Sequence, residues 1–143
     1  MWYGTYIHSI DTKDRFILPS KFRDKIKELG SRKFYLTRGL DGCLFLFSYE
    51  IWRDLEDKLK SLSFTKQQSR FFNRLYFSGA QEVEIDSQGR VVLPDYLKEY
   101  AGISKDIVII GVADRIEIWA RNKWDKFDED NRERFEEMAE GLF

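Results

Sequence analysis

Hydrophobic and polar positions follow the same order of patterns in two successive stretches of this 143-residue chain. Each stretch opens with a strand-like segment, a turn-rich segment and a short apolar run, which together predict two strands joined by a tight connection. A short segment with helical spacing follows, and two apolar runs then flank a glycine-containing turn, which predicts a hairpin. The repeated order predicts an α+β fold made of two β-rich modules.

The ends of these elements can be placed on the chain. Pro19 and Ser20 mark the start of the first short helix, with Ser20 as its N-cap, and Gly30 suits its end. Asp95 begins the second short helix, and Gly102 ends it. Strands are expected at residues 2–8, 16–18, 33–38 and 43–47 in the first stretch and at 82–85, 90–93, 107–110 and 115–119 in the second, with hairpin turns at 39–42 and 111–114.

Longer helical patterns separate the two stretches and follow the second one. Ser48 can cap a helix after the first stretch, and residues 65–68 have the form of a capping box that opens another. Asn122 is expected to cap a last helix, whose exposed face is acidic. The apolar positions of these helices recur with helical spacing: Trp52, Leu55, Leu59 and Leu62 in the first, Phe71, Phe72 and Leu75 turned inward in the second, and Trp124, Phe127, Phe135 and Met138 in the third.

The two turn-rich segments contain the same nine-residue phrase. Residues 11–19 read Asp-Thr-Lys-Asp-Arg-Phe-Ile-Leu-Pro, and residues 86–94 read Asp-Ser-Gln-Gly-Arg-Val-Val-Leu-Pro, an offset of 75. A period this long that occurs only twice argues against a solenoid, which needs at least ~3 stacked units. Each repeat core spans roughly 45 residues, near the lower size limit for folding alone. We therefore expect the two modules to share one hydrophobic core.

Composition places the chain among ordinary globular domains. It is 43% hydrophobic and 34% charged, and no apolar run approaches the ~20 residues that a membrane helix needs. The N-terminus lacks the basic and then apolar pattern of a signal peptide. The single cysteine, Cys43, cannot form an internal disulfide and is most simply a small core residue. We expect a cytoplasmic protein with no membrane partner.

The formal net charge of −1 hides an uneven distribution. Residues 1–40 carry a net charge of +5, residues 41–80 carry +1, and residues 81–143 carry −7. Such asymmetry can focus a local field on an anionic partner even when the total charge is near zero. Ordinary scatter of surface charge is the alternative, and charge alone does not exclude it.

In each turn an aspartate is followed four residues later by an arginine: Asp11 and Arg15, then Asp86 and Arg90. An aspartate that starts a turn can bond the backbone two residues on, and the arginine can return to its carboxylate. In one interpretation both residues only brace the turn, since ion pairs at turns are common. In the other, the braced guanidinium is a fixed donor fork for phosphate or for guanine O6 and N7. The residues alone leave both interpretations open.

The doubled phrase, with each copy leading into a short helix and a hairpin, resembles the MraZ family, bacterial regulators built from two tandem SpoVT/AbrB-like domains. The resemblance covers nearly the whole chain. It implies AbrB-like domains at 5–47 and 76–119, connecting helices at 48–75 and a C-terminal helix at 120–143. It also implies a swapped-hairpin architecture, in which the two modules form one pseudo-twofold, barrel-like core with flanking helices.

What the resemblance implies for function is a sequence-specific DNA-binding transcriptional regulator. Members of the family form ring-shaped oligomers and bind short direct repeats of double-stranded DNA upstream of their own operon, in a cluster of division and cell-wall genes. The expected location is therefore the cytoplasm, in association with the nucleoid. No cofactor is implied.

Carried onto this chain, the family motif falls on Asp11 and Arg15 in the first turn and on Asp86 and Arg90 in the second, and Lys13 matches the usual motif lysine. We expect the two arginines to contact DNA, with Arg15 as a base reader, and the two aspartates to brace the turns. The candidates for phosphate contact are Lys13, Lys21, Arg23 and Lys25, although each lysine taken alone is more simply a solvated surface residue.

Two positions depart from the family phrase. Asp14 stands where glycine is usual, so the first turn must accept a non-glycine residue, although aspartate visits left-handed geometry more readily than most residues. Gln88 stands where lysine is usual, which removes one cation from the second turn. Together with the charge distribution, this predicts that the first repeat contributes more electrostatic binding than the second.

Other classes of function have weaker support. The only histidine, His8, lies in an expected strand, and the chain has no nucleophile elbow, no glycine-rich phosphate loop and no His/Cys cluster for a metal. Asp11 and Asp86 can be imagined as an acid–base pair, but a neighbouring arginine keeps each carboxylate ionised. We expect no catalytic residue and no metal. A structural or protein-interaction ring without specific DNA recognition stays the main alternative, and RNA binding is a weaker one.

Overall fold

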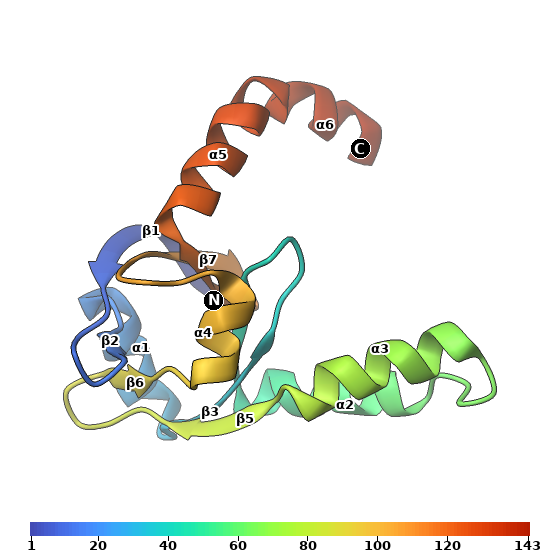
Figure 1. Cartoon of the computed structure of the whole chain (residues 1–143), viewed down its shortest axis with the longest axis horizontal. Helices are drawn as coiled ribbons and strands as arrows, with labels where there is room; N and C mark the ends of the chain where they lie inside the picture. Colours follow the sequence, from blue (N-terminus) through green and yellow to red (C-terminus); the bar gives the residue numbers. More distant parts are fainter.

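The computed structural model describes residues 1–143, and its eight strands and six α-helices follow the order that the sequence pattern predicts (Figure 1). The expected α+β class is confirmed. The elements are β1 (Trp2–Ser9), β2 (Arg15–Ile17), α1 (Ser20–Leu29), β3 (Lys33–Arg38), β4 (Leu44–Ser48), α2 (Tyr49–Lys60), α3 (Gln67–Ser78), β5 (Gln81–Glu84), β6 (Arg90–Val92), α4 (Asp95–Ala101), β7 (Asp106–Ala113), β8 (Arg115–Ala120), α5 (Arg121–Asn131), the 3-10 turn η1 (Arg132–Arg134) and α6 (Phe135–Leu142).

Six strands form one antiparallel sheet in the order β1-β7-β8-β4-β3-β5. The first strand of each half pairs with the hairpin of the other half, because β1 lies on β7 and β5 lies on β3. Close approach of β1 to β7 requires a glycine at Gly111, since a Cβ there would meet the backbone of Trp2 and Tyr3. The hairpin turn expected at 111–114 is shorter than predicted, because β7 continues to Ala113 along β1.

The two halves share one core, as the small size of each repeat predicts. A cluster of 22 buried residues contains Phe16, Leu18 and Phe22 from the first half together with Val91, Leu93 and Leu97 from the second. A second cluster lies beneath α2 and α3, where the Trp52 ring stacks between Tyr35 and Tyr76, with centroid distances of 5.0 and 5.7 Å. Cys43 is buried in this second cluster, and burial raises the pKa of its thiol.

The starts of three helices differ from the predictions. Pro19, not Ser20, is the N-cap of α1, because its carbonyl accepts the first helical N–H bonds. The capping box at 65–68 does not form: Lys66 is the N-cap of α3, and the Thr65 hydroxyl bonds to a neighbouring serine. Helix α5 begins directly where β8 ends, which places its N-cap at Ala120 and not at Asn122. Ser48 is the N-cap of α2, as expected, although its side chain makes no capping bond.

Two helical faces also differ from the predictions. Helix α3 packs inward through Tyr76 and Phe77, which contact Trp52, so the expected inward residues are exposed. The last helical pattern is broken by η1 into α5 and α6, and most of its apolar positions beyond the break face solvent. The predicted helix-face residues that are exposed are Leu62, Phe71, Phe72, Leu75, Phe127, Phe135 and Met138. Figure 1 shows α2–α3 and α5–α6 as two helical arms that leave the sheet in different directions.

Candidate nucleic-acid interface

The first turn is built around the carboxylate of Asp11. Its Oδ1 accepts hydrogen bonds from the backbone N–H groups of Lys13 and Arg15, both at 2.9 Å. Its Oδ2 accepts a hydrogen bond from Arg15 Nε at 2.8 Å. The Asp11 N–H donates to the Arg15 carbonyl at 2.8 Å and closes the turn. One carboxylate therefore satisfies the turn backbone and fixes the base of the guanidinium group.

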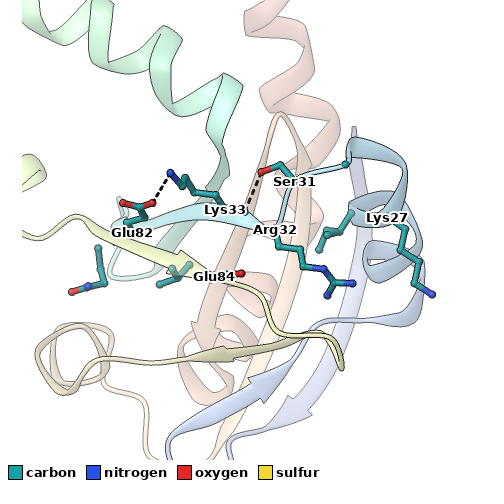
Figure 2. A pocket seen from close by; sticks show the side chains of 10 residues that line it. Lys27, Ser31, Arg32, Lys33, Glu82 and Glu84 are labelled. Carbon is teal, nitrogen blue, oxygen red and sulfur yellow. Dashed lines mark hydrogen bonds and ion pairs between the residues drawn. The ribbon is translucent and has the colours of Figure 1, made fainter.

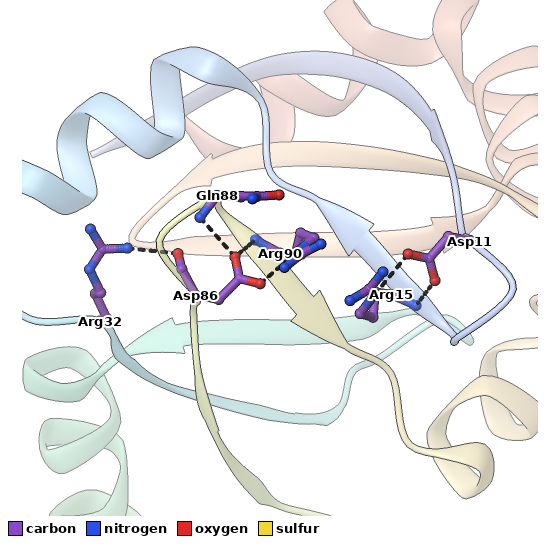
Figure 3. Close-up of polar contacts among 6 residues, drawn as sticks. All are labelled: Asp11, Arg15, Arg32, Asp86, Gln88 and Arg90. Atoms are coloured by element: carbon purple, nitrogen blue, oxygen red, sulfur yellow. Dashed lines mark hydrogen bonds and ion pairs between the residues drawn. The ribbon is translucent and has the colours of Figure 1, made fainter.

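The second turn has the same hydrogen bonds, as Figure 3 shows. Asp86 Oδ1 accepts from the backbone N–H groups of Gln88 at 2.9 Å and Arg90 at 2.8 Å. Asp86 Oδ2 accepts from Arg90 Nε at 2.6 Å, and the Asp86 N–H donates to the Arg90 carbonyl at 3.2 Å. The repeated phrase thus encodes one turn geometry twice.

These bonds lower the pKa of both carboxyl groups from the ordinary value of 3.8. For Asp11 the backbone hydrogen bond from Arg15 is the largest cause. For Asp86, loss of solvation acts to raise the pKa, but the hydrogen bonds from Arg90 and Gln88 together outweigh it. Both groups are therefore carboxylates at neutral pH, with no proton to donate as a general acid.

The two turns meet because β2 and β6 pair as a separate two-stranded antiparallel sheet, which we term the ribbon. Its register places Arg15 opposite Val92, Phe16 opposite Val91, and Ile17 opposite Arg90. Phe16 and Val91 are buried in the shared core. Because successive side chains alternate between faces, the remaining four side chains share the other face. This outward face of the ribbon comprises Arg15, Ile17, Arg90 and Val92.

The ends of the ribbon are bonded reciprocally. The Leu18 N–H donates to the Gly89 carbonyl at 2.9 Å, and the Leu93 N–H donates to the Asp14 carbonyl at 2.8 Å. The two bonds are equivalent in the two repeats, because Leu93 stands 75 residues after Leu18 and Gly89 stands 75 residues after Asp14. Each turn is therefore hydrogen-bonded to the residue that follows the strand of the other repeat, so both ends of the ribbon are closed.

Both guanidinium groups reach the surface, with 26% of the Arg15 side chain and 28% of the Arg90 side chain exposed. Each group donates only its Nε to its own aspartate, and its Nη1 and Nη2 have no hydrogen-bond partner in the protein. The bracing and the donor interpretations are thus compatible. Each arginine is fixed by one nitrogen and keeps a planar pair of donors for an external acceptor.

Cations from the first half of the chain surround the second turn. The Arg23 side chain lies across Gly89, where any Cβ would collide with it. Arg32 Nη1 donates to the Asp86 carbonyl at 2.6 Å (Figure 3). A cleft of about 280 Å³ is lined there by Arg23, Asp24, Lys27 and Arg32 together with Ser87, Gln88 and Gly89. That the first repeat supplies more electrostatic binding stays a prediction; the cations that line this cleft come from the first repeat but lie beside the turn of the second.

The first turn has the converse arrangement. Asp14 has a φ of 56°, so it accepts the left-handed conformation that Gly89 has in the second turn, with a φ of 80°. Lys98, on α4, donates to Asp14 Oδ1 at 2.9 Å. Lys98 is the repeat equivalent of Arg23, and Asp14 is the equivalent of Gly89. A cation from the helix of each repeat therefore lies on the turn of the other, but at the first turn an aspartate neutralises it.

The other candidate cations lie in different places. Lys13 and Lys21 are exposed, and neither ammonium group pairs with an acidic side chain. Lys25 is held away from the ribbon: its Nζ donates to the Met1 carbonyl and lies 5.9 and 5.3 Å from the ring centroids of Trp2 and Tyr3. We therefore leave Lys25 out of the candidate interface.

A larger open cleft of about 900 Å³ lies between the end of α1, β3 and β5 (Figure 2). It carries both signs of charge, and Lys33 Nζ pairs with Glu82 Oε1 at 3.0 Å. The lining carries three cations, Lys27, Arg32 and Lys33, and two carboxylates, Glu82 and Glu84, so its net charge of +1 attracts an anion only weakly. No three His, Cys, Asp or Glu side chains gather where they could hold a metal ion, and no helix is both long and apolar enough to cross a membrane.

Comparison with known proteins explains the doubled turn. The sequence model of the family described as MraZ protein matches residues 1–75 and again residues 76–143. The chain belongs to the MraZ family. Over 142 residues it is 51% identical to the protein named "Transcriptional regulator MraZ" of Acetivibrio thermocellus, a match that covers 99% of this chain and 96% of that relative. MraZ is a family of transcriptional regulators and not of enzymes, which confirms the expectation that this member is no enzyme.

Sequence reasoning missed two cations at the turns of this MraZ protein. Lys98 could have been found, because it stands 75 residues after Arg23, the same offset as the repeated phrase. Arg32 has no counterpart in the phrase, and its contact with Asp86 depends on how β3 enters the sheet. Only the fold reveals that contact.

Proposed function

We propose that this chain is a sequence-specific, double-stranded-DNA-binding transcriptional regulator. The observation that supports this most strongly is the outward face of the ribbon, where Arg15 and Arg90 are each held through Nε with both Nη groups unpaired. The major groove of B-DNA admits a two-stranded ribbon, and arginine pairs in a bidentate manner with guanine O6 and N7 there. The name of the 51% identical relative supports the regulatory role.

The aspartates Asp11 and Asp86 contribute indirectly. A free arginine loses rotamer freedom when it binds a base, and this loss opposes binding. Here the carboxylates have already fixed the first part of each guanidinium, so less freedom is lost on contact. Lys13, Lys21 and Arg23, with Arg32 beside Arg23, supply phosphate contacts that position the ribbon and carry no sequence information.

We also propose that the chain acts as a homo-oligomer, a closed ring. Support comes from apolar side chains that the single chain leaves exposed on both helical arms, Phe71 and Leu75 on α3 and Phe135 and Leu142 on α6. A repeated head-to-tail contact that closes gives cyclic symmetry and presents identical ribbons at regular intervals. Several ribbons can then engage short direct repeats at once, so avidity compensates for weak single contacts.

The remaining parts of this proposal rest on the family resemblance. The domains are proposed at 5–47 and 76–119, related by a pseudo-twofold axis within a barrel-like core, and the reciprocal bonds at the ends of the ribbon support this relation. The proposed target lies upstream of the chain's own operon, among division and cell-wall genes. The proposed location is the cytoplasm and nucleoid, and no cofactor is involved.

Footprinting on the chain's own upstream region tests the proposal. The expected result is protection of short, evenly spaced boxes, with an affinity that falls steeply as salt rises. Light scattering on the same preparation measures the oligomer, and a Phe71→Ser/Leu75→Ser variant should lower its mass. An intact oligomer that protects no box at any salt concentration would contradict the regulator and favour the structural ring.

A further inference from the structure

The outward face of the ribbon exposes two aliphatic side chains whose apolar surface finds no partner in the chain. Ile17 is 41% exposed and Val92 is 58% exposed, whereas Phe16 and Val91 between them are buried. Ile17 and Val92 are equivalent under the repeat offset of 75, as are Arg15 and Arg90. Both repeats therefore place a β-branched aliphatic residue two positions after the arginine, on the same face.

The register joins these residues across the repeats. Arg15 lies directly opposite Val92, and Arg90 lies directly opposite Ile17. Directly opposite side chains in an antiparallel pair have Cβ atoms about 5 Å apart. Successive bases along a strand are about 3.4 Å apart, so one such pair can reach neighbouring bases. Each pair thus combines a guanidinium from one repeat with an aliphatic group from the other.

In the major groove the only apolar group that a base pair presents is the thymine 5-methyl group, and aliphatic side chains contact it. We propose that Ile17 and Val92 recognise thymine through this methyl group, each beside a guanine contacted by the arginine opposite. The inference rests on the proposed function and adds the chemistry of base selection to it. Each arginine–aliphatic pair takes one residue from each repeat, so neither repeat alone contains a complete pair.

Replacing thymine by uracil in the protected duplex removes the methyl group and keeps the base pair. For the wild type, affinity should fall about fourfold for each contacted methyl group. The Ile17→Ala and Val92→Ala variants should each become indifferent to uracil at the one position that residue contacts and keep the wild-type response at the other. Ile7→Ala, which truncates a residue that is 60% exposed on β1, is the matched control and should respond as the wild type does.

Thermal unfolding of each variant checks that truncation at these exposed positions leaves the fold intact. Ile17→Ser and Val92→Ser repeat the test with every methyl group of the side chain removed. Wild-type binding that ignores uracil at every position, or alanine and serine variants that keep the full wild-type response, would overturn this inference alone. Failure of the wild type to bind any duplex would overturn the proposed function and this inference with it.

Discussion

Asp11 and Asp86 hold the two arginines of the ribbon through a charged hydrogen bond that asparagine cannot reproduce. Asp86→Asn should therefore loosen Arg90 and reduce the preference for the specific site by about tenfold, which corresponds to ~1.4 kcal/mol. Affinity for unrelated duplex should stay equal or rise, because a negative charge has been removed. Competition between specific and unrelated duplex measures the ratio, and an unchanged ratio would show that the brace has no role in recognition.

The two turns differ at Asp14, which occupies the position that Gly89 has in the second. Asp14→Gly should free Lys98 for a phosphate and remove a repelling charge, so the salt dependence of DNA affinity should steepen by about 0.9. The stability change should be small, because the Lys98–Asp14 pair is half-buried and still reaches solvent, where an ion pair contributes about 0–1 kcal/mol. Asp41→Gly is the matched control, since Asp41 also has a positive φ, of 64°, but lies in the β3–β4 hairpin. If Asp14→Gly and Asp41→Gly gave the same salt dependence of DNA affinity, the proposed neutralisation of Lys98 by Asp14 would be contradicted.

Helix α1 connects the two repeats, because Arg23 projects from it onto the turn of the second one. Arg23→Ala should lower the salt slope by about 0.9, the effect of one lost phosphate contact. Lys25→Ala on the same helix removes the same charge from a lysine held over Trp2 and Tyr3, and it should leave the slope unchanged. A larger change of the salt slope for Lys25→Ala than for Arg23→Ala would contradict the account, because it would place the DNA on the Lys25 side of α1.

The spacing of apolar positions predicted the order of helices and strands, because each element has its own spacing and a residue such as Gly30 or Gly102 that marks its end. The shared core follows from the small size of each repeat. The apolar runs do not show which residues are buried, since Phe16 and Val91 are buried but Ile17 and Val92 are exposed. Which side chains pack against one another depends on the whole folded chain, and the local sequence does not specify it. Trp52 stacks on Tyr76, and this contact turns Phe71 and Leu75 of α3 outward against their apolar character.

The candidate site shows the same division. The repeated phrase identified both aspartate–arginine turns, since each is closed within five residues. It could not show that Arg23 and Arg32 lie beside the other repeat's turn, because that depends on the pairing of β2 with β6 and on the path into β3. Charge counted along the sequence therefore does not tell which turn the cations of the first repeat lie beside.

Folding of the entire chain should depend on pH in two steps. Burial and, to a lesser extent, the positive charge of Arg23 lower the pKa of His8 from 6.5, and hydrogen bonds lower those of Asp11 and Asp86 from 3.8. In each case the unfolded chain binds more protons below the ordinary pKa, so stability is full above that value and falls on acidification. Urea unfolding should show one loss as the pH falls below 6.5 and another below 3.8. His8→Gln should remove the first loss, and a variant that retained it would refute the assignment.

The two repeats and their helical arms form one unit in which the ribbon is the proposed DNA-contacting surface. Its direct test is the affinity of Arg15→Ala/Arg90→Ala for the protected duplex, measured beside Arg121→Ala/Arg132→Ala. The control loses the same charge from two arginines that also pair with aspartates, at 3.8 and 3.4 Å, on α5 and η1. The ribbon variant should lose at least about thirtyfold in affinity, since each bidentate arginine contributes at least ~1 kcal/mol of discrimination. The control should bind nearly as the wild type does, and equal affinities of the two folded double variants would contradict the account.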